Sequence, residues 1–469
     1  MKHLQRHAMF FILVLLPGFA DAAEFDGARL NLMWAIPFAG ILLSIALMPV
    51  MASQFWHRHF GKVSTAWTLA FLLPFAYFFG FQAAGVSLIH ALLAEYIPFI
   101  ILLAALYTVA GGIYIRGSLH GSPALNCGLL LIGVVLASFM GTTGASMLMI
   151  RPLIRANDNR QHKVHLVVFF IFLVSNVGGS LTALGDPPLF LGFLKGVDFF
   201  WTARFILTET LFMVVSLLAI FYVVDSHYFK KEGVLPVALP TDSEQIGFDG
   251  GANFWLLGAT AGLVLMSGVW KSPVVFDVAG TAVGLPGLLR DVGLGIIIVI
   301  SLRITAKSVH DSNQFSWAPM QEVAKLFIGI FVTIIPVIAM LQAGSNGPFS
   351  AIVAGITRPD GSPDPAMYFW ATGLLSSFLD NAPTYLVFFN TAGGDPKALM
   401  TTLAPTLAAI SAGAVFMGAN TYIGNAPNLM VKAVAEDRGV EMPSFFGYMI
   451  WSCGVLLPLF IIVTLIWFR

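Results

Sequence analysis

The chain has 469 residues, of which 58% are hydrophobic and only 10% are charged, and its 24 basic and 24 acidic residues give a formal net charge of zero. This composition excludes a soluble globular domain and predicts an all-α integral membrane protein whose main partner is the lipid bilayer, with no nucleic-acid partner. The 45 glycines and 25 prolines exceed what smooth spanning helices need, so broken helices and re-entrant segments are expected.

The first 22 residues have the layout of a signal peptide. Met1-Lys2 and Arg6 are followed by an apolar stretch at 9–16 and then by Ala20-Asp21-Ala22. The apolar stretch is too short to span a bilayer comfortably, which favours cleavage before Ala23 over a retained anchor. The predicted organisation is a signal peptide at 1–22, a first transmembrane half at 23–225, a cytoplasmic linker at 226–252 and a second transmembrane half at 253–469.

Apolar stretches after the signal predict a multi-pass protein of the bacterial cytoplasmic (inner) membrane. Loops with an excess of Lys and Arg are expected on the cytoplasmic side. The predicted spans are 31–51, 65–83, 96–115, 202–224, 253–270, 290–306, 323–342 and 444–467, with two broken spans at 164–197 and 399–434. The predicted cytoplasmic loops contain Arg58 and Lys62, Arg116, Arg151 to Lys163, Lys230-Lys231, Arg303 and Lys307, and Lys432 with Arg438.

Two further apolar segments are predicted to enter and leave the bilayer on one side, as re-entrant helical hairpins. Basic residues flank both ends of the first, residues 123–150, whose tip is expected near Gly141-Thr142-Thr143. The second, residues 364–392, starts and ends outside, with its tip near Asp380-Asn381-Ala382-Pro383. The two halves would then have opposite topology, which is the inverted-repeat plan of many secondary transporters.

A weak internal repeat supports this plan. Residues 123–199 recur in residues 362–438 at one fixed offset, so that the amide Asn425 lies 239 residues after the acidic Asp186. The matching positions are mostly Gly, Pro, Ser, Thr, Asn and Asp inside apolar runs, where a membrane helix would normally be uninterrupted.

The first broken span contains a cluster of oxygen-bearing side chains. Glycines and the pair Pro187-Pro188 interrupt the helix and leave carbonyl oxygens unpaired. The side chains that add oxygen atoms are Ser175, Asn176, Thr182 and Asp186. Small hard cations bind such oxygens, so a cation site is expected, although the same break could serve only to pack helices.

Asp380 is the most informative single residue. A carboxylate at bilayer depth costs about 3 kcal/mol to insert, so such a residue is functional by default. One carboxyl group can accept a proton or bind a cation, which is the simplest chemical basis for exchanging H⁺ against a metal ion. The alternative is an exposed Asp at a helix end. Asp380 and Asp186 are therefore predicted to be titrating ligands for Na⁺.

Neutral oxygen ligands are expected from the second hairpin and the second broken span. They are Ser376, Ser377, Asn381 and Thr384 in the hairpin, and Asn420, Thr421 and Asn425 in the broken span. Amide and hydroxyl oxygens coordinate a cation without adding charge. No nucleotide-binding loop, metal-cluster spacing or nucleophile elbow is present, so no cofactor, ATP-driven transport or soluble-type catalysis is expected.

Several of these motifs resemble those of the ion transporter superfamily, and within it those of NhaD-type sodium/proton antiporters and their citrate-transporter-like relatives. The resemblance implies exchange of Na⁺ or Li⁺ against H⁺, alternating access and a homodimer. In the antiporters the cation is associated with a Ser-x-x-x-Asp-Asn hairpin motif and with an Asn and an Asp ten residues apart. The residues that match the hairpin motif here are Ser376, Asp380 and Asn381, and those that match the spaced pair are Asn176 and Asp186. The first hairpin departs from the family pattern, because it has Gly141-Thr142 where a second Asp-Asn is expected.

Two other functions remain open beside the main prediction, a sodium(lithium)/proton antiporter that is not an enzyme. A citrate- or dicarboxylate-type carrier needs positive groups or helix N-termini to bind its substrate. Arg151, at a hairpin end, is the one basic residue near the motifs. A metal–citrate complex, however, could bind to the same Asp residues. An intramembrane aspartyl protease would use two membrane Asp residues. Its expected tripeptide, Pro123-Ala124-Leu125, precedes both of them here, which disfavours the protease.

Overall fold

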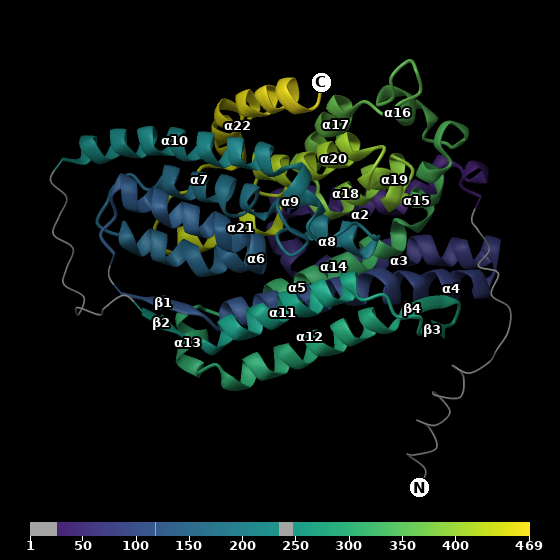
Figure 1. Ribbon diagram of the computed structural model, residues 1–469, viewed down its shortest axis with the longest axis horizontal. Helices are drawn as coiled ribbons and strands as arrows, with labels where there is room; N and C mark the ends of the chain where they lie inside the picture. The colour runs from purple at the N-terminus through teal and green to yellow at the C-terminus, as the bar shows by residue number, and fades with distance from the viewer. Residues whose placement is uncertain (1–25, 118, 234–246) are drawn as a thin grey trace, which may run out of the picture.

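The computed structural model describes residues 26–117, 119–233 and 247–469 (Figure 1). The predicted signal peptide, 1–22, and residues 234–246 of the predicted linker lie outside these residues. Its first half contains η1 (Gly27–Arg29), η2 (Leu32–Ala35), α2 (Ile36–Met51), α3 (Ser53–Phe79), α4 (Phe81–His90), the π-helix η3 (Ala91–Tyr96), α5 (Ile97–Gly111), β1 (Tyr114–Arg116), α6 (Pro123–Ala156), α7 (Val164–Leu173), η4 (Val177–Gly179), α8 (Pro187–Leu194), α9 (Trp201–Phe205) and α10 (Leu207–Glu232).

The second half begins after the gap at 234–246. It contains β2 (Gly247–Asp249), α11 (Ala252–Val269), β3 (Val275–Val278), β4 (Thr281–Gly284), α12 (Leu285–Ile304), α13 (Lys307–Ser312), α14 (Ala318–Thr333), α15 (Ile335–Gln342), η5 (Gly344–Asn346), α16 (Ser350–Gly355), α17 (Pro365–Phe378), α18 (Asn381–Thr391), α19 (Pro396–Met400), α20 (Ala404–Met417), η6 (Gly418–Asn420), α21 (Ala426–Asp437) and α22 (Phe445–Trp467).

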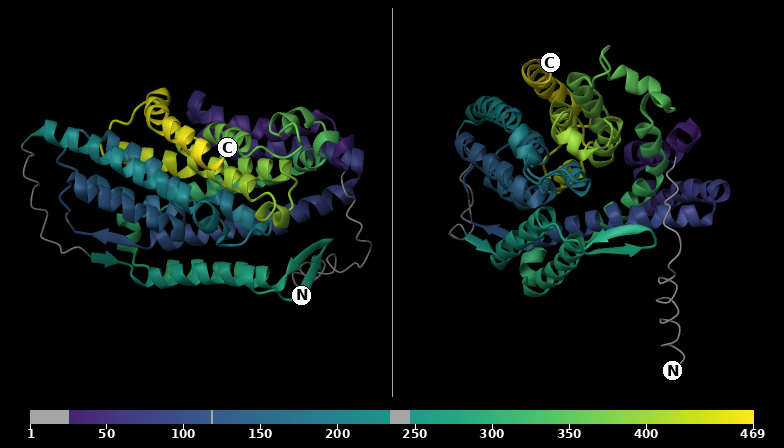
Figure 2. Two further views of the ribbon diagram at one scale, coloured as in Figure 1. Left: turned by 45° about the horizontal axis from the view of Figure 1, so that its top comes forward. Right: turned by 45° about the vertical axis from the view of Figure 1, so that its right-hand side comes forward.

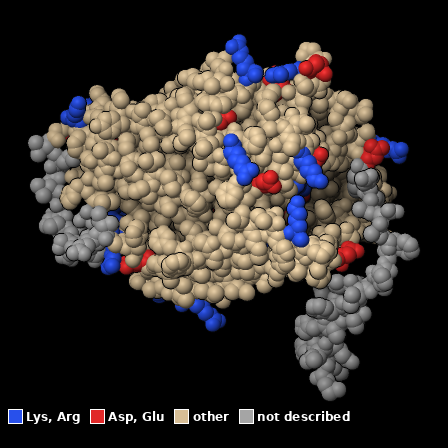
Figure 3. Space-filling model, viewed as in Figure 1, with Lys and Arg blue, Asp and Glu red and all other residues tan. Residues whose placement is uncertain are grey.

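The prediction of a multi-pass helical membrane protein is confirmed. Within the described residues, eight helical segments are long and apolar enough to cross a membrane, and the bent pair α14–α15 makes a ninth. The fold is not purely helical, because β1 pairs with β2 and β3 pairs with β4 in two short antiparallel sheets. Figure 3 shows that the left half of the face seen in Figure 1 carries almost no charged side chains between its edges, whereas a group of Lys, Arg, Asp and Glu side chains lies right of its centre.

Two predicted spans differ from the structure, one by a bend inside it and one in its boundary. The span predicted at 323–342 is bent by 42° between α14 and α15, where Pro336 lacks the amide hydrogen that a continuous helix needs. The interval predicted between the spans 65–83 and 96–115 is helical, since α4, η3 and α5 form one apolar segment from Phe81 to Gly111. The break falls earlier, at Gly80, whose φ of 90° favours glycine.

Helix α6 is a hairpin despite its length of 34 residues. Gly141 has φ 78° and ψ 153°, which interrupts the helix inside the predicted tip. The two ends of α6 meet, because the Gly121 amide donates to the Ala156 carbonyl at 2.6 Å and the side-chain amides of Asn126 and Asn157 exchange two hydrogen bonds of 2.8 and 3.0 Å. The segment thus returns to the end of the molecule from which it starts.

A buried ionic cluster fastens the base of this hairpin to α7 and α10. Asp225 accepts hydrogen bonds from Arg160 at 2.6 Å and from Asn126 at 2.9 Å, and its carboxylate lies 2.8 Å from Nε2 of His165. Arg160 also contacts Glu232 at 3.2 Å. The side chains of Arg160 and Asp225 have no solvent exposure, so the charges neutralise one another inside the protein.

The second hairpin and both helix breaks also fall in the predicted segments. Helices α17 and α18 pack against each other and are separated only by Leu379 and Asp380. The first broken span is interrupted at 174–186 and the second at 418–425. Both views in Figure 2 place α12, with α11, along one side of the molecule, away from the yellow C-terminal helix. Helices α5, α11 and α12 contact one another and form that side.

Candidate functional site

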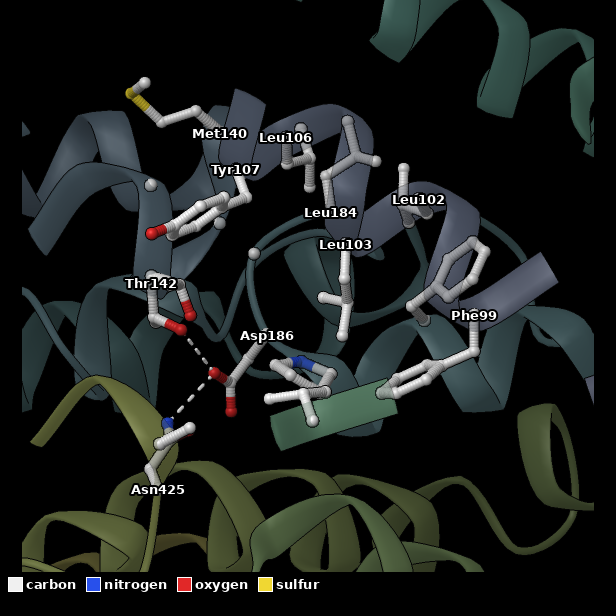
Figure 4. A pocket seen from close by; sticks show the side chains of 18 of the residues that line it. Phe99, Leu102, Leu103, Leu106, Tyr107, Met140, Thr142, Leu184, Asp186 and Asn425 are labelled. Carbon is white, nitrogen blue, oxygen red and sulfur yellow. Dashed lines mark hydrogen bonds between the residues drawn. The ribbon is translucent and has the colours of Figure 1, made fainter. Parts of the chain in front are cut away.

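Asp186 lies where the two halves of the chain meet. Its side chain follows the first helix break, immediately before α8, and the residue is 1% exposed. Its carboxylate accepts hydrogen bonds from Thr142 Oγ1 at 2.7 Å and from Asn425 Nδ2 at 3.1 Å (Figure 4). It also accepts one from Asn381 Nδ2 at 2.5 Å. Three neutral donors from three different segments therefore hold one buried carboxylate.

Asp380 occupies the tip of the second hairpin. Its Oδ1 caps α18 by accepting from the amide of Ala382 at 3.0 Å. The residue is partly buried and lines the same cavity as Asp186. The two acidic residues, one from each half, thus face a common space, as the sequence predicts.

The cavity between them has a volume of about 90 Å³. Its polar lining comes from Thr142 and Thr143 at the first hairpin tip, from Asp186 and Asp380, and from Asn425. Figure 4 shows the opposite wall, which is apolar and comes mainly from α5 and the turn before α8. The labelled side chains of this wall are Phe99, Leu102, Leu103, Leu106, Met140 and Leu184.

A second set of amides joins the two helix breaks behind the cavity. Asn176 Nδ2 donates to Asn428 Oδ1 at 2.8 Å, and Asn425 Nδ2 lies 3.1 Å from the carbonyl oxygen of Ser175. Asn428 in turn donates to the carbonyl of Gly418 at 2.9 Å. These contacts hold the broken backbone in place where helical hydrogen bonds are missing.

The same hydrogen bonds occur in both halves at positions 239 residues apart. Thr182 Oγ1 donates to the carbonyl of Ser138 at 2.5 Å, and Thr421 Oγ1 donates to the carbonyl of Ser377. Ser138 Oγ donates to the Gly178 carbonyl at 2.8 Å, and Ser377 Oγ donates to the Met417 carbonyl at 3.1 Å. Each hairpin is therefore bound to the helix break of its own half in the same way.

A family model described as "Putative citrate transport" matches residues 27–468. The chain belongs to this family. No curated relative matches its sequence. The match confirms the resemblance to the ion transporter superfamily through its citrate-transporter-like branch, and it identifies the chain as a secondary transporter and not an enzyme.

In this family member, several predicted ligands stabilise the backbone and do not line the cavity. Their hydroxyls donate to main-chain carbonyl oxygens, as Ser376 does to Ala414 at 2.6 Å and Thr384 does to Asp380 at 3.0 Å. The predicted residues that do line the cavity are Gly141, Thr142, Thr143, Asp186, Asp380 and Asn425. Those that contact Asp186 or belong to or contact the helix breaks are Ser175, Asn176, Thr182, Ser377, Asn381, Asn420 and Thr421. Ser376 and Thr384 instead donate to Ala414 in α20 and to Asp380 in the second hairpin.

Two buried amide oxygens favour a cation near the second hairpin. Within the described residues, Oδ1 of Asn381 and Oδ1 of Asn420 have no hydrogen-bond partner. Nδ2 of Asn381 donates to Asp186, and Nδ2 of Asn420 donates to Ser377 Oγ at 2.9 Å. Unpaired buried oxygens are costly, and oxygen ligands are what hard cations require.

Three residues of the site were not predicted as ligands. Asn428 is fully buried and ties the second break to the first. Ser146 lies 2.8 Å from the hydroxyl of Ser175, and Ser138 holds Thr182. The repeat itself contains the signal for Ser138, because its counterpart at the fixed offset is Ser377.

Gly185 is expected to tolerate no side chain. A Cβ at this position would lie 2.2 Å from the Gly179 carbonyl oxygen, which is main chain and cannot move aside. Gly185→Ala should displace Asp186 and reduce uptake into proteoliposomes by about tenfold or more. Gly128→Ala in α6 is the control, since nothing lies within 4 Å of its Cβ. Uptake by Gly185→Ala equal to that of the control would show that the break is looser than the structure indicates.

Proposed function

We propose that this transporter carries a small polycarboxylate of the citrate type together with a cation. The family supports the carboxylate, and the cavity supports the cation. The observation that carries the proposal is the charge of the cavity, since two carboxylates and no Lys or Arg stand among its described lining residues. An anion can approach two carboxylates only with its charge compensated, either as a metal complex or with protons and Na⁺.

Exchange of Na⁺ or Li⁺ against H⁺, the activity of NhaD-type antiporters, is the second candidate. The specific observation in its favour is size. A cavity of about 90 Å³ is small beside the roughly 300–1,000 Å³ of typical small-molecule sites, so it accommodates a small ion more readily than a whole citrate ion. In either case Asp186 and Asp380 are the proposed cation and proton ligands, assisted by Asn381, Asn425 and Thr142.

The inverted repeat belongs to the proposal as well. The hydrogen bonds that recur at 239 residues support two halves built on one plan, and the proposed plan inserts the two hairpins from opposite sides. The transport step would then be a movement of the hairpins and broken helices relative to α5, α11 and α12. A location in the bacterial inner membrane, cleavage of the signal peptide and a homodimer complete the proposal.

Asp380→Asn tests the cation role directly. Asn can still cap α18, so folding should be retained, but the charge is lost. Uptake of radiolabelled citrate into proteoliposomes should fall by about tenfold, and stimulation by Na⁺ or Mg²⁺ or by an inward proton gradient should disappear.

Asp364→Asn is the matched control, because Asp364 caps α17 in the same way, accepting from the Ala366 amide at 3.0 Å. Its uptake should remain near that of the wild type. If the wild type takes up no citrate or dicarboxylate, yet Na⁺ or Li⁺ collapses a proton gradient, the antiport is correct. Cation-stimulated citrate uptake by Asp380→Asn would contradict the role of Asp380 in either function.

A further inference from the structure

A second, larger cavity lies at the far end of α8. Its volume is about 540 Å³, within the range of small-molecule sites. The walls come from the end of α8 and the segment leading to α9, from the end of α11, and from β4 with the start of α12. Its charged lining residues are Asp198, Arg204, Arg290 and Asp291.

Arg290 is the unusual member of this lining. The residue is only 5% exposed, yet it lines the cavity. Its Nε donates to Asp291 at 2.7 Å, and its guanidinium lies 5.9 Å from the ring centroid of Phe190. Among the described residues, none accepts a hydrogen bond from its two terminal nitrogens. Those nitrogens form the fork that binds a carboxylate with two hydrogen bonds.

The two cavities are neighbours along the same helices. Phe190 lines the first cavity, and Phe193, one turn further along α8, lines the second. On α5, Phe99 lines the first and Pro98 lines the second. Phe190 thus separates the carboxylates of the first cavity from Arg290 in the second. The second cavity lies at the start of α12, whereas Arg303, in a predicted cytoplasmic loop, is at its end.

We propose that the second cavity is an outer vestibule that receives the carboxylate substrate before it passes Phe190 to the first cavity. This inference rests on the proposed carboxylate transport. Arg290 binds one carboxylate of the substrate, and Arg204 at the exposed rim attracts another. Asp198 and Asp291 add negative charge to the lining beside the two arginines. A lining with both signs of charge suits a carboxylate that arrives together with its cation.

The test compares citrate uptake in right-side-out and everted membrane vesicles for Arg290→Gln. Loss of a charge-assisted hydrogen bond should raise the KM for external citrate by about tenfold, with Vmax nearly unchanged. The KM in everted vesicles should not move, because the substrate then enters from the other side. Arg290→Lys should be intermediate, and Arg303→Gln, at the other end of α12, should match the wild type.

The double variant Arg290→Gln/Asp291→Asn controls for misfolding. It removes both members of the ion pair, so neither charge is left without its partner. It should show the same one-sided KM increase.

An unchanged external KM, or an equal change in both orientations, would overturn the vestibule while leaving carboxylate transport intact. Absence of citrate and dicarboxylate uptake by the wild type would reject the proposed function and the vestibule together. If Arg290→Gln changes only the response to phosphatidylglycerol in the vesicles, the cavity binds a lipid phosphate instead, and the substrate role is wrong.

Discussion

Asp186→Asn is expected to reduce coupled uptake by at least about a hundredfold. The carboxylate accepts hydrogen bonds from Thr142, Asn381 and Asn425. An amide in its place would bring two more N–H groups toward donors that already point at this position, and it would remove the charge that faces the cavity. The variant should therefore lose both the cation and the contacts that join the two halves.

The measurement is initial uptake of radiolabelled citrate, with Na⁺- or Li⁺-driven collapse of a proton gradient in parallel. Both should approach the signal of protein-free liposomes. Asp437→Asn, on the exposed end of α21, is a control for the loss of one charge and should transport normally. Uptake by Asp186→Asn above half of the wild-type rate would reject Asp186 as the central ligand.

The largest expected effect on stability comes from Asp225→Ala. The change leaves Arg160 and His165 buried without the carboxylate that binds both of them. Removing one partner of a buried ion pair typically costs about 3–5 kcal/mol. Glu232 still contacts Arg160 at 3.2 Å, which favours the lower end of this range. Thermal unfolding of the purified protein in detergent should show a clear drop in Tm.

Asp249→Ala is the matched comparison for Asp225→Ala. Asp249 also faces an arginine, Arg116 at 3.5 Å, but both side chains are more than 40% exposed. Exposed pairs contribute about 0–1 kcal/mol, so the Tm should hardly move. Equal shifts in the two variants would mean that the ionic cluster at the base of the first hairpin does not stabilise the fold.

The features that sequence reasoning predicted well are those with a large local cost. A carboxylate in an apolar run is expensive, so Asp186 and Asp380 stand out without a structure, and both line the first cavity, whereas their role as ligands stays a prediction. Basic residues do not cross the bilayer readily, so the charges around residues 123–150 indicate a hairpin. Gly and Pro interrupt helices locally, and both predicted helix breaks occur in the structure.

The features that were missed depend on contacts between distant segments. Asn428 looks like any residue at a helix break until it is seen 2.8 Å from Asn176, which is 252 positions away. Hydroxyls such as Ser376 look like ligands in the sequence, and only the structure shows that Ser376 donates to a nearby carbonyl and does not line the cavity. Arg290 resembles an ordinary cation near a helix end, and only the structure, in which it lies 5.9 Å from the Phe190 ring, reveals that it is buried beside a cavity.

The three hydrogen bonds to Asp186 also bear on leakage through an empty carrier. An ionised carboxylate only accepts hydrogen bonds, whereas a protonated one must donate one. Thr142 can turn its hydroxyl to accept that proton. Protonation also removes the negative charge that strengthens all three bonds, so the bonds from Asn381 and Asn425, which join the halves, become weaker. With neither proton nor cation, all three bonds remain, and they oppose reorientation. The empty, ionised protein is then the form least able to change sides, which limits slippage without cargo.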